Sequence, residues 1–316
     1  MTTPVCELLG IRHPVVQAPI AAAPPLAAAV SEAGALGTVA LTWVDDVKAI
    51  VAQTAAATDR PFAGNLVLAW DQRHRLDQAL EAGLRIVSLA SGDPAGHVEQ
   101  AHDAGALVLH TVGSPEEARR SAALGVDVIV AQGWEAGGHV WGTIATLPLV
   151  PAVVDAVAPV PVIAAGGIGD ARGVSAVLAL GAQAAWLGTR FLVAQEAPVH
   201  SVYKQRVLEA AETDAVWYRD LYDIDWPKAA HRALRNATAA AWETAGCPPP
   251  GARPGEGEPV ATRADGEPIV RYSCALPLTD TSGDIAALSL WAGQSVALAR
   301  REQPAAEIVA ELVSRL

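Results

Sequence analysis

Cysteine and phenylalanine are scarce in this 316-residue sequence, which has three cysteines and two phenylalanines. The cysteines are Cys6, Cys247 and Cys274, an odd and widely spaced set that indicates neither a disulfide framework nor a zinc site. No cluster of His, Cys, Asp and Glu has the spacing of metal ligands. We therefore expect a protein without a metal, working in a reducing cytoplasm.

Positive charge is also in short supply, because 22 Lys and Arg residues stand against 34 Asp and Glu and give a net charge of −12. Phosphate contacts require clustered Lys and Arg, so nucleic acid is excluded as a partner. No apolar run reaches the ~18 residues that span a bilayer. The N-terminus has no basic region followed by an apolar one, so we expect no secretory signal and no membrane partner.

Apolar residues are abundant: 51% of the chain is hydrophobic and 18% is charged, so it can bury a large core. Over the first ~190 residues, short apolar runs alternate with helical patterns. Most runs are continuous, which is typical of parallel strands covered on both faces. The eight predicted strands are Pro14–Ala18, Gly37–Leu41, Phe62–Leu68, Arg85–Leu89, Ala106–His110, Asp127–Ala131, Pro161–Ala165 and Ala184–Gly188.

Local signals mark the helices between these strands. Ser114 is followed by Pro115 and by a glutamate at the capping-box position, and Asp170 precedes another helical pattern. Eight such strands in a row favour a closed (β/α)₈ TIM barrel over a doubly wound open sheet, which stays the structural alternative. The predicted helices are Leu26–Ala33, Val44–Ala57, Arg73–Ala82, Ala95–Ala104, Pro115–Leu124, Leu149–Val157 and Ala171–Leu180.

The strand–helix rhythm stops after Phe191. Residues 195–245 have a helical pattern with many aromatics, and residues 246–268 are rich in Pro and Gly, which prevents regular structure. A last helical pattern runs from about Asp284 to Leu316, with a break at Pro304. We predict a barrel of residues 1–194 completed by C-terminal helices in 284–316. Residues 195–283 then form a smaller, mostly helical and irregular domain that covers the barrel mouth as a lid.

Active sites in such barrels form at the carboxyl ends of the strands. The sixth strand runs into Gln132-Gly133-Trp134-Glu135-Ala136-Gly137-Gly138-His139. The glycines let the backbone approach a ligand, and the Gln132 amide suits the edge of a flavin ring. His139 is the candidate acid or base, since an ordinary imidazole titrates near neutrality. The alternative is a flexible glycine loop with a solvent-facing histidine.

The seventh and eighth strands end in glycine turns, where these barrels commonly bind phosphate. Backbone N–H groups of Gly166, Gly167, Gly188 and Thr189 can hold a phosphate without any lysine. The alternative is two tight turns that need glycine for steric reasons.

Other polar and aromatic residues fall near the predicted mouth. Asn65 is a polar residue in an apolar strand, where a flavin carbonyl or ring N–H would satisfy it, although it can also cap a neighbouring loop. His110 ends the fifth strand and can point into the mouth. We place Trp134, Trp141 and His110 in the substrate pocket, and we interpret His231 as structural.

Together these segments resemble the nitronate monooxygenase family, formerly called 2-nitropropane dioxygenases. The Glu-Ala-Gly-Gly-His sequence is also shared with FMN-dependent enoyl-acyl-carrier-protein reductases. The matching segments cover nearly the whole chain and are Gln17-Ala18-Pro19-Ile20, Gly64-Asn65-Leu66, Ala131-Gln132-Gly133, Glu135-Ala136-Gly137-Gly138-His139, Pro161–Ile168, Gly188-Thr189-Arg190-Phe191 and Ala292-Gly293-Gln294-Ser295.

The resemblance implies that His139 is the catalytic base and that FMN and O₂ oxidise nitronates or nitroalkanes to a carbonyl compound and nitrite, without NAD(P)H. The alternative is an NAD(P)H-dependent FMN reductase of an enoyl thioester or quinone. A homodimer is compatible with either function. The residues expected to hold FMN are Pro19, Ile20, Asn65, Gln132, Gly137, Gly138, Gly166, Gly167, Trp186, Leu187, Gly188 and Thr189.

Three departures from the family pattern concern the substrate. Ile20 stands where a methionine is usual. Val140 and Trp141 separate His139 from the next glycine, where familiar members have one residue. Trp134, Trp141 and Trp186 predict a bulky aromatic mouth, so we expect the substrate preference to differ from that of the better-known members.

Overall fold

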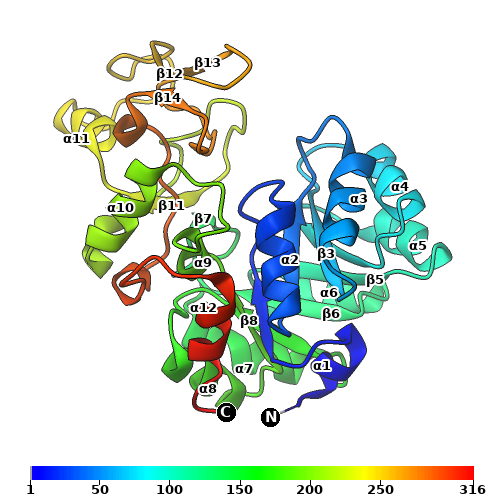
Figure 1. Cartoon of the computed structure of the whole chain (residues 1–316). Helices are drawn as coiled ribbons and strands as arrows, with labels where there is room; N and C mark the ends of the chain where they lie inside the picture. The colour runs from blue at the N-terminus through cyan, green and yellow to red at the C-terminus, as the bar shows by residue number, and fades with distance from the viewer. Residues whose placement is uncertain (1) are drawn as a thin grey trace.

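The computed structural model describes residues 2–316 and is built around an eight-stranded parallel sheet that curls into a barrel (Figure 1). Val16 of the first strand forms a parallel bridge with Leu36, the residue just before the second strand. The Gln17 N–H donates to the Leu36 carbonyl at 2.9 Å. These contacts join the two ends of the sheet and confirm the predicted barrel. In sheet order the strands are β1 (Val15–Gln17), β9 (Ala184–Leu187), β8 (Val162–Ala165), β6 (Val128–Gln132), β5 (Leu107–Val112), β4 (Ile86–Ala90), β3 (Phe62–Val67) and β2 (Gly37–Ala40).

Helices surround the barrel, and the predicted caps hold them. Ser114 Oγ accepts from the Glu117 N–H at 3.2 Å, and Asp170 accepts from the backbone N–H groups of Arg172 and Gly173. The helices are α1 (Pro4–Leu9), α2 (Pro24–Glu32), α3 (Val47–Ala57), α4 (Arg73–Glu81), α5 (Ala95–Asp103), α6 (Pro115–Ala123), α7 (Thr146–Val157) and α8 (Ala171–Ala179).

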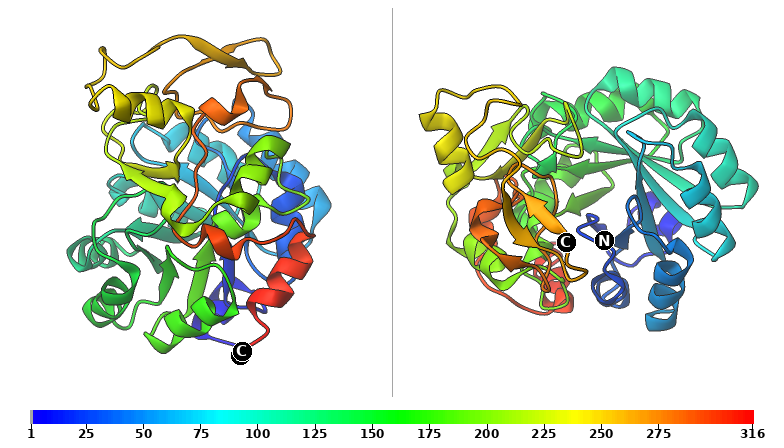
Figure 2. Two further views of the ribbon diagram at one scale, coloured as in Figure 1. Left: turned by 90° about the vertical axis from the view of Figure 1, so that its left-hand side faces the viewer. Right: turned by 90° about the horizontal axis from the view of Figure 1, so that it is seen from above.

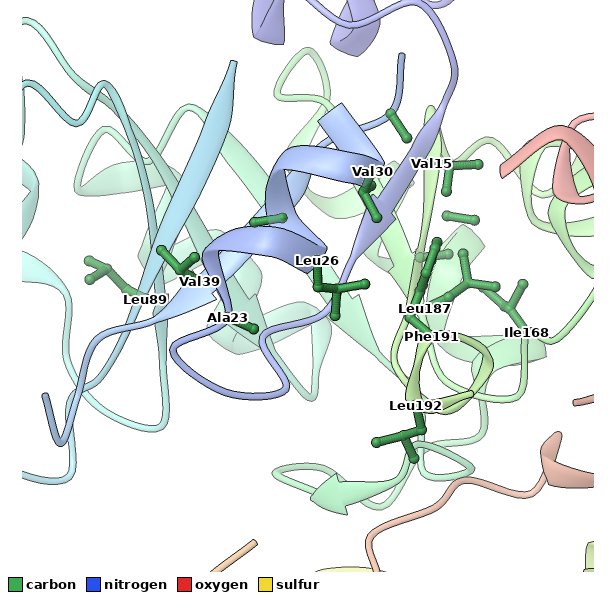
Figure 3. Close-up of a cluster of buried hydrophobic side chains, with 14 of the residues drawn as sticks. Val15, Ala23, Leu26, Val30, Val39, Leu89, Ile168, Leu187, Phe191 and Leu192 are labelled. Carbon is green, nitrogen blue, oxygen red and sulfur yellow. The ribbon is translucent and has the colours of Figure 1, made fainter. Parts of the chain in front are cut away.

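Alternation along each strand divides the core into two layers, because successive side chains point to opposite faces. Residues such as Leu109 and Val130 fill the barrel interior, together with apolar residues of α1. The opposite face packs against the helices. Figure 3 shows Leu26 and Val30 of α2 between the strands that carry Val39 and Leu187.

One late helix completes the barrel wall. Helix α12 (Ala305–Leu312) packs against α2, α8 and the short α9 (Thr189–Leu192), and Arg190 pairs with Glu311 at 2.8 Å. The two chain termini therefore lie at the same end of the molecule (Figures 1 and 2). The prediction of helix from 284 onwards was wrong up to residue 304, where two short turns occur, η2 (Ile285–Ala287) and η3 (Val296–Leu298). The Leu234 N–H donates to the Leu290 carbonyl, so tertiary contacts hold this segment extended.

Residues 195–283 lie above one side of the barrel in Figure 1; they contain one small three-stranded sheet and two strands of a second, whose third strand comes from the loop after β6. The helical pattern predicted for 195–245 is interrupted by a strand pair, because β11 finds a partner in β7 (Gly138–His139) of the distant sixth-strand loop. No helix in residues 2–316 is long and apolar enough to cross a membrane. The remaining elements are α10 (Ser201–Glu209), η1 (Glu212–Asp214), β10 (Ala215–Tyr218), β11 (His231–Leu234), α11 (Ala237–Thr244), β12 (Pro259–Thr262), β13 (Pro268–Val270) and β14 (Ser282–Gly283).

Candidate active site

A cavity of about 700 Å³ opens at the carboxyl ends of the barrel strands, and residues 195–283 supply one of its walls. His139 and Trp141 line it. All twelve residues expected to hold FMN line the same cavity: Pro19, Ile20, Asn65, Gln132, Gly137, Gly138, Gly166, Gly167, Trp186, Leu187, Gly188 and Thr189. Residues from five strands and their loops thus converge on one space of the size that takes a small-molecule ligand.

The loop after β6 is held by the side chains of its own sequence. The Gln132 amide nitrogen donates to the His139 carbonyl at 3.1 Å, and the Trp141 N–H donates to the Gln132 amide oxygen at 3.0 Å. The Glu135 carboxylate accepts from the Thr146 N–H at 2.8 Å and from its hydroxyl at 2.9 Å. Gln132 therefore fixes the backbone on both sides of the candidate base as well as lining the cavity.

Glycine is required at Gly137 by a close approach of two backbones. The Gln294 N–H donates to the Glu135 carbonyl at 3.0 Å, which brings residues 292–294 against the loop. A Cβ at Gly137 would lie 2.5 Å from the Ala292 carbonyl carbon and closer still to the Gly293 nitrogen. Residues 292–294 thus pack against the backbone of the loop that carries His139 and form the back of that loop.

His139 lies on β7, directly opposite His231 of β11. Trp226 stacks on its ring, with centroids 3.8 Å apart and planes tilted by 30°, and Trp291 lies 5.3 Å away. Its Nε2 is buried and has no hydrogen-bond partner among residues 2–316. Burial, and to a smaller extent the nearby His231, lower the pKa of His139 to about 3. The imidazole is therefore neutral at pH 7, the state that a proton acceptor needs.

His231 has the structural arrangement expected of it. Its Nδ1 lies 2.9 Å from the Ala229 carbonyl, and its Nε2 accepts from the Tyr222 N–H at 3.1 Å. Because one nitrogen faces an acceptor and the other a donor, the ring is held as a single neutral tautomer. Burial lowers the pKa of His231 to about 4.

Asn65 enters the cavity from β3. Its amide nitrogen donates to the Ser88 carbonyl and to the Ser88 hydroxyl of β4, both at 3.2 Å. Two neighbouring strands thus fix the orientation of the amide. This leaves its oxygen as the acceptor at the cavity wall.

The ends of β8 and β9 form a further wall. Gly166 and Gly167 have φ angles of 99° and 70°, which L side chains rarely adopt. Thr189 Oγ1 accepts from the Gly293 N–H at 2.9 Å, and Ser295 Oγ donates to the Ile168 carbonyl at 3.3 Å. The two predicted glycine turns are therefore brought together, along with the segment 293–295.

Two predicted pocket residues lie elsewhere. His110 points away from the barrel interior, where its Nδ1 lies 2.8 Å from Ser121 Oγ of α6. Thr111 takes the position facing the cavity. Trp134 is covered by the Arg232 guanidinium, 4.6 Å above its ring, and does not line the cavity. Both placements were therefore wrong: His110 is on the helix-facing side of β5, and Trp134 packs against Arg232 of β11.

Several cavity residues were not predicted. Trp43, Tyr203, Trp226 and Trp291 add aromatic surface, and Arg263 adds a guanidinium at an exposed position. The aromatic content of residues 195–245 was the available signal, but nothing in the spacing indicates which rings face the barrel. Among residues 2–316 no group of three or more His, Cys, Asp or Glu side chains is placed to hold a metal ion.

Comparison with known proteins agrees with this geometry. The family model described as nitronate monooxygenase matches residues 2–80 and 67–315. The nitronate monooxygenase of Pseudomonas aeruginosa is 32% identical, covering 100% of this chain and 99% of the relative. A relative of Mycobacterium tuberculosis, named (3aS,4S,5R,7aS)-5-hydroxy-7a-methyl-1-oxo-octahydro-1H-indene-4-carboxyl-CoA dehydrogenase, is 39% identical over 66% of this chain. The chain spans 61% of that relative's length.

Solved structures give the same picture. A variant of FabK from Thermotoga maritima superposes with a TM-score of 0.82 at 31% identity, covering 99% of this chain and 96% of that one. Nitroalkane oxidase from Streptomyces ansochromogenes superposes with a TM-score of 0.79 at 27% identity, covering 99% and 97%. From the family match and these full-length similarities, the chain belongs to the nitronate monooxygenase family.

Proposed function

We propose that this protein uses FMN and O₂ to oxidise nitronates and nitroalkanes to a carbonyl compound and nitrite, with His139 as the base. One observation carries the proposal: His139 and all twelve expected FMN residues surround a single cavity of about 700 Å³. The family, the Pseudomonas aeruginosa relative and the similarity to a nitroalkane oxidase support the reaction class.

The cavity suits FMN in its chemistry as well as its size. Asn65 and Gln132 place amide groups at the wall, where they can face the polar edge of a flat ring. The turns at Gly166, Gly167 and Gly188 leave room for a phosphate beside the backbone. When bound, FMN would supply the redox chemistry, taking electrons from the substrate and passing them to O₂.

His139 would take the proton from the carbon that bears the nitro group. Its ring is neutral at pH 7, and its Nε2 has no hydrogen-bond partner in the part of the chain that the structure describes, so the lone pair is available. Trp226 and Trp291 surround the ring with apolar surface, which excludes water from the reacting atoms. A preformed nitronate has already lost this proton and would not need the base.

Residues 195–283 would act as the lid of this site, because Trp226 and Arg263 of that segment line the cavity. The reaction would take place in the cytoplasm, where the three cysteines, which are unpaired in the structure, remain reduced.

One observation favours a second candidate, an NAD(P)H-dependent reductase of an enoyl thioester or quinone. Arg263 is the one Lys or Arg side chain on the described part of the cavity wall. A guanidinium at the mouth suits the phosphates of an acyl carrier. The Mycobacterium tuberculosis relative is named for a carboxyl-CoA substrate.

The two candidates differ in the compound that reduces the flavin. Purified protein should be yellow and release FMN on denaturation; a colourless preparation that cannot be reconstituted with FMN would refute the flavin site. Without oxygen, a nitronate should change the flavin absorbance, while NADH and NADPH leave it unchanged. If instead a reduced nucleotide bleaches the flavin and the nitronate does not, the second candidate replaces the first.

A further inference from the structure

The ring of His139 is enclosed by three side chains that differ in how firmly they are held. Trp226 stacks on it at 3.8 Å, Trp291 lies at 5.3 Å, and His231 lies at 5.9 Å. With these neighbours in place, Nε2 is buried. A substrate therefore reaches Nε2 only if one of the three neighbours moves.

Two of the three neighbours are fixed by regular structure. His231 belongs to β11 and uses both ring nitrogens in contacts to the backbone. Trp291 bridges Ala233 of the same strand, and its carbonyl accepts a hydrogen bond from the Tyr203 hydroxyl. The His231 ring cannot turn without breaking these contacts, and the backbone that carries Trp291 is fixed by its bridge and its carbonyl.

Trp226 is held differently, because it lies in the irregular stretch between β10 and β11. Asp225 and Lys228 flank it with φ angles of 78° and 61°, a strained backbone conformation for residues other than glycine. Its backbone N–H donates to the nearby Asp223 carbonyl, within the same stretch. Of the three neighbours, Trp226 thus lies in the least regular stretch of backbone.

The indole of Trp226 rests instead on two tryptophans of the barrel loops. Trp43 follows β2 and Trp70 follows β3, and their ring centroids lie 6.0 Å and 5.0 Å from that of Trp226, edge to face. Trp43 is 60% exposed and also lines the cavity. Aromatic edge contacts hold the indole without a directional hydrogen bond, so they can be broken and reformed.

From this geometry we propose that Trp226 determines which substrates reach His139. Its indole fills the space over the imidazole and must swing toward the mouth, against Trp43 and Trp70, before a carbon acid can approach Nε2. Substrates that are narrow at the acidic carbon reach Nε2 after a small movement of the indole. Branched or cyclic substrates require the indole to leave the space over the imidazole. The proposal rests on the proposed function in taking His139 as the base.

Replacing Trp226 by alanine tests this with substrates of increasing width: nitroethane, 2-nitropropane and nitrocyclohexane. We expect kcat/KM for nitrocyclohexane relative to nitroethane to rise about tenfold or more. A single methylene group in an apolar pocket already changes discrimination between substrates by about 10–200-fold. Trp226→Phe, which keeps a smaller ring, should give an intermediate ratio. The matched control is Trp217→Phe, since Trp217 packs against Trp134 outside the cavity and should leave the ratio unchanged.

A second measurement separates this proposal from the proposed function. Opening the space over His139 should raise its pKa toward the ordinary histidine value. The pKa of His139 is measured by following its imidazole NMR signals against pH in FMN-loaded wild type and Trp226→Ala. If His139 titrates identically in both proteins, or if the substrate ratio of an active variant does not change, Trp226 is not the determinant. If the pKa rises but no nitroalkane is turned over by either protein, the proposed reaction fails while Trp226 still covers His139.

Discussion

Replacing Gly137 by alanine should destabilise the protein by a predictable amount. The new Cβ would meet the backbone of Ala292 at 2.5 Å, and no side chain can rotate to relieve that contact. Overpacking of this kind costs about 1–3 kcal/mol, and a backbone contact places this site at the upper end. Unfolding entropy of about 2.1 cal/mol/K per residue implies that each kcal/mol lowers the Tm of a 316-residue chain by about 1.5 °C. We therefore expect Tm to fall by about 4–5 °C.

The assay is thermal unfolding followed by circular dichroism, with FMN present at a fixed excess. Gly96→Ala is the matched control, because Gly96 lies in α5 and a Cβ there meets nothing within 4 Å. Because Gly96 is the second residue of α5, that change should raise stability by less than the ~0.5–1 kcal/mol of a Gly-to-Ala change in the middle of a helix, and should not lower it. If Gly137→Ala melts no lower than wild type, residues 292–294 do not form the back of the loop as described.

Two further predictions concern the buried histidines and the loop after β6. Burial lowers the pKa of His110 and His231 to about 4 and that of His139 to about 3, so the folded state keeps all three neutral where the unfolded chain binds protons. The free energy of unfolding should therefore fall as pH drops from 6.5 toward 4, by about 1.4 kcal/mol per pH unit for each histidine. Equal midpoints of urea unfolding at pH 7 and pH 5 would contradict this. Glu135→Ala removes the acceptor of the Thr146 N–H and hydroxyl and should cost about 1–3 kcal/mol in urea unfolding, with Glu135→Gln milder. An unchanged midpoint for Glu135→Ala would show that these two bonds do not hold the loop.

Much of the barrel follows from the sequence because its determinants are local. Continuous apolar runs such as that of 162–165 indicate strands buried on both faces, and Ser114 and Asp170 occur where a helix needs an acceptor for its first N–H groups. The position of the loop after β6 at the cavity was also predictable, because the carboxyl ends of barrel strands form the mouth of the barrel.

The orientation of single side chains was not predictable. His110 and Thr111 are neighbours on β5, and a shift of one residue exchanges the face that each occupies. The sequence places His110 at the strand end but does not show which residues of β5 point into the barrel. In the structure these are Leu109 and Thr111, so His110 points to the opposite face.

Residues 195–283 depend on distant partners, which propensity does not reveal. β11 forms because β7, some ninety residues earlier in the chain, offers it an edge. Trp226 was visible only as one aromatic among several, and its position over His139 follows from that pairing and from two barrel loops.

The central claim is that His139 is the base beside a flavin in this cavity, and His139→Asn tests it most directly. Turnover of neutral nitroethane requires removal of a proton, whereas turnover of the preformed ethyl nitronate does not. Because a general base contributes about 10²–10⁴-fold, we predict a loss of that size in kcat/KM for nitroethane, with nitronate turnover and FMN content close to wild type. A variant that oxidises nitroethane at the wild-type rate would contradict the assignment of His139.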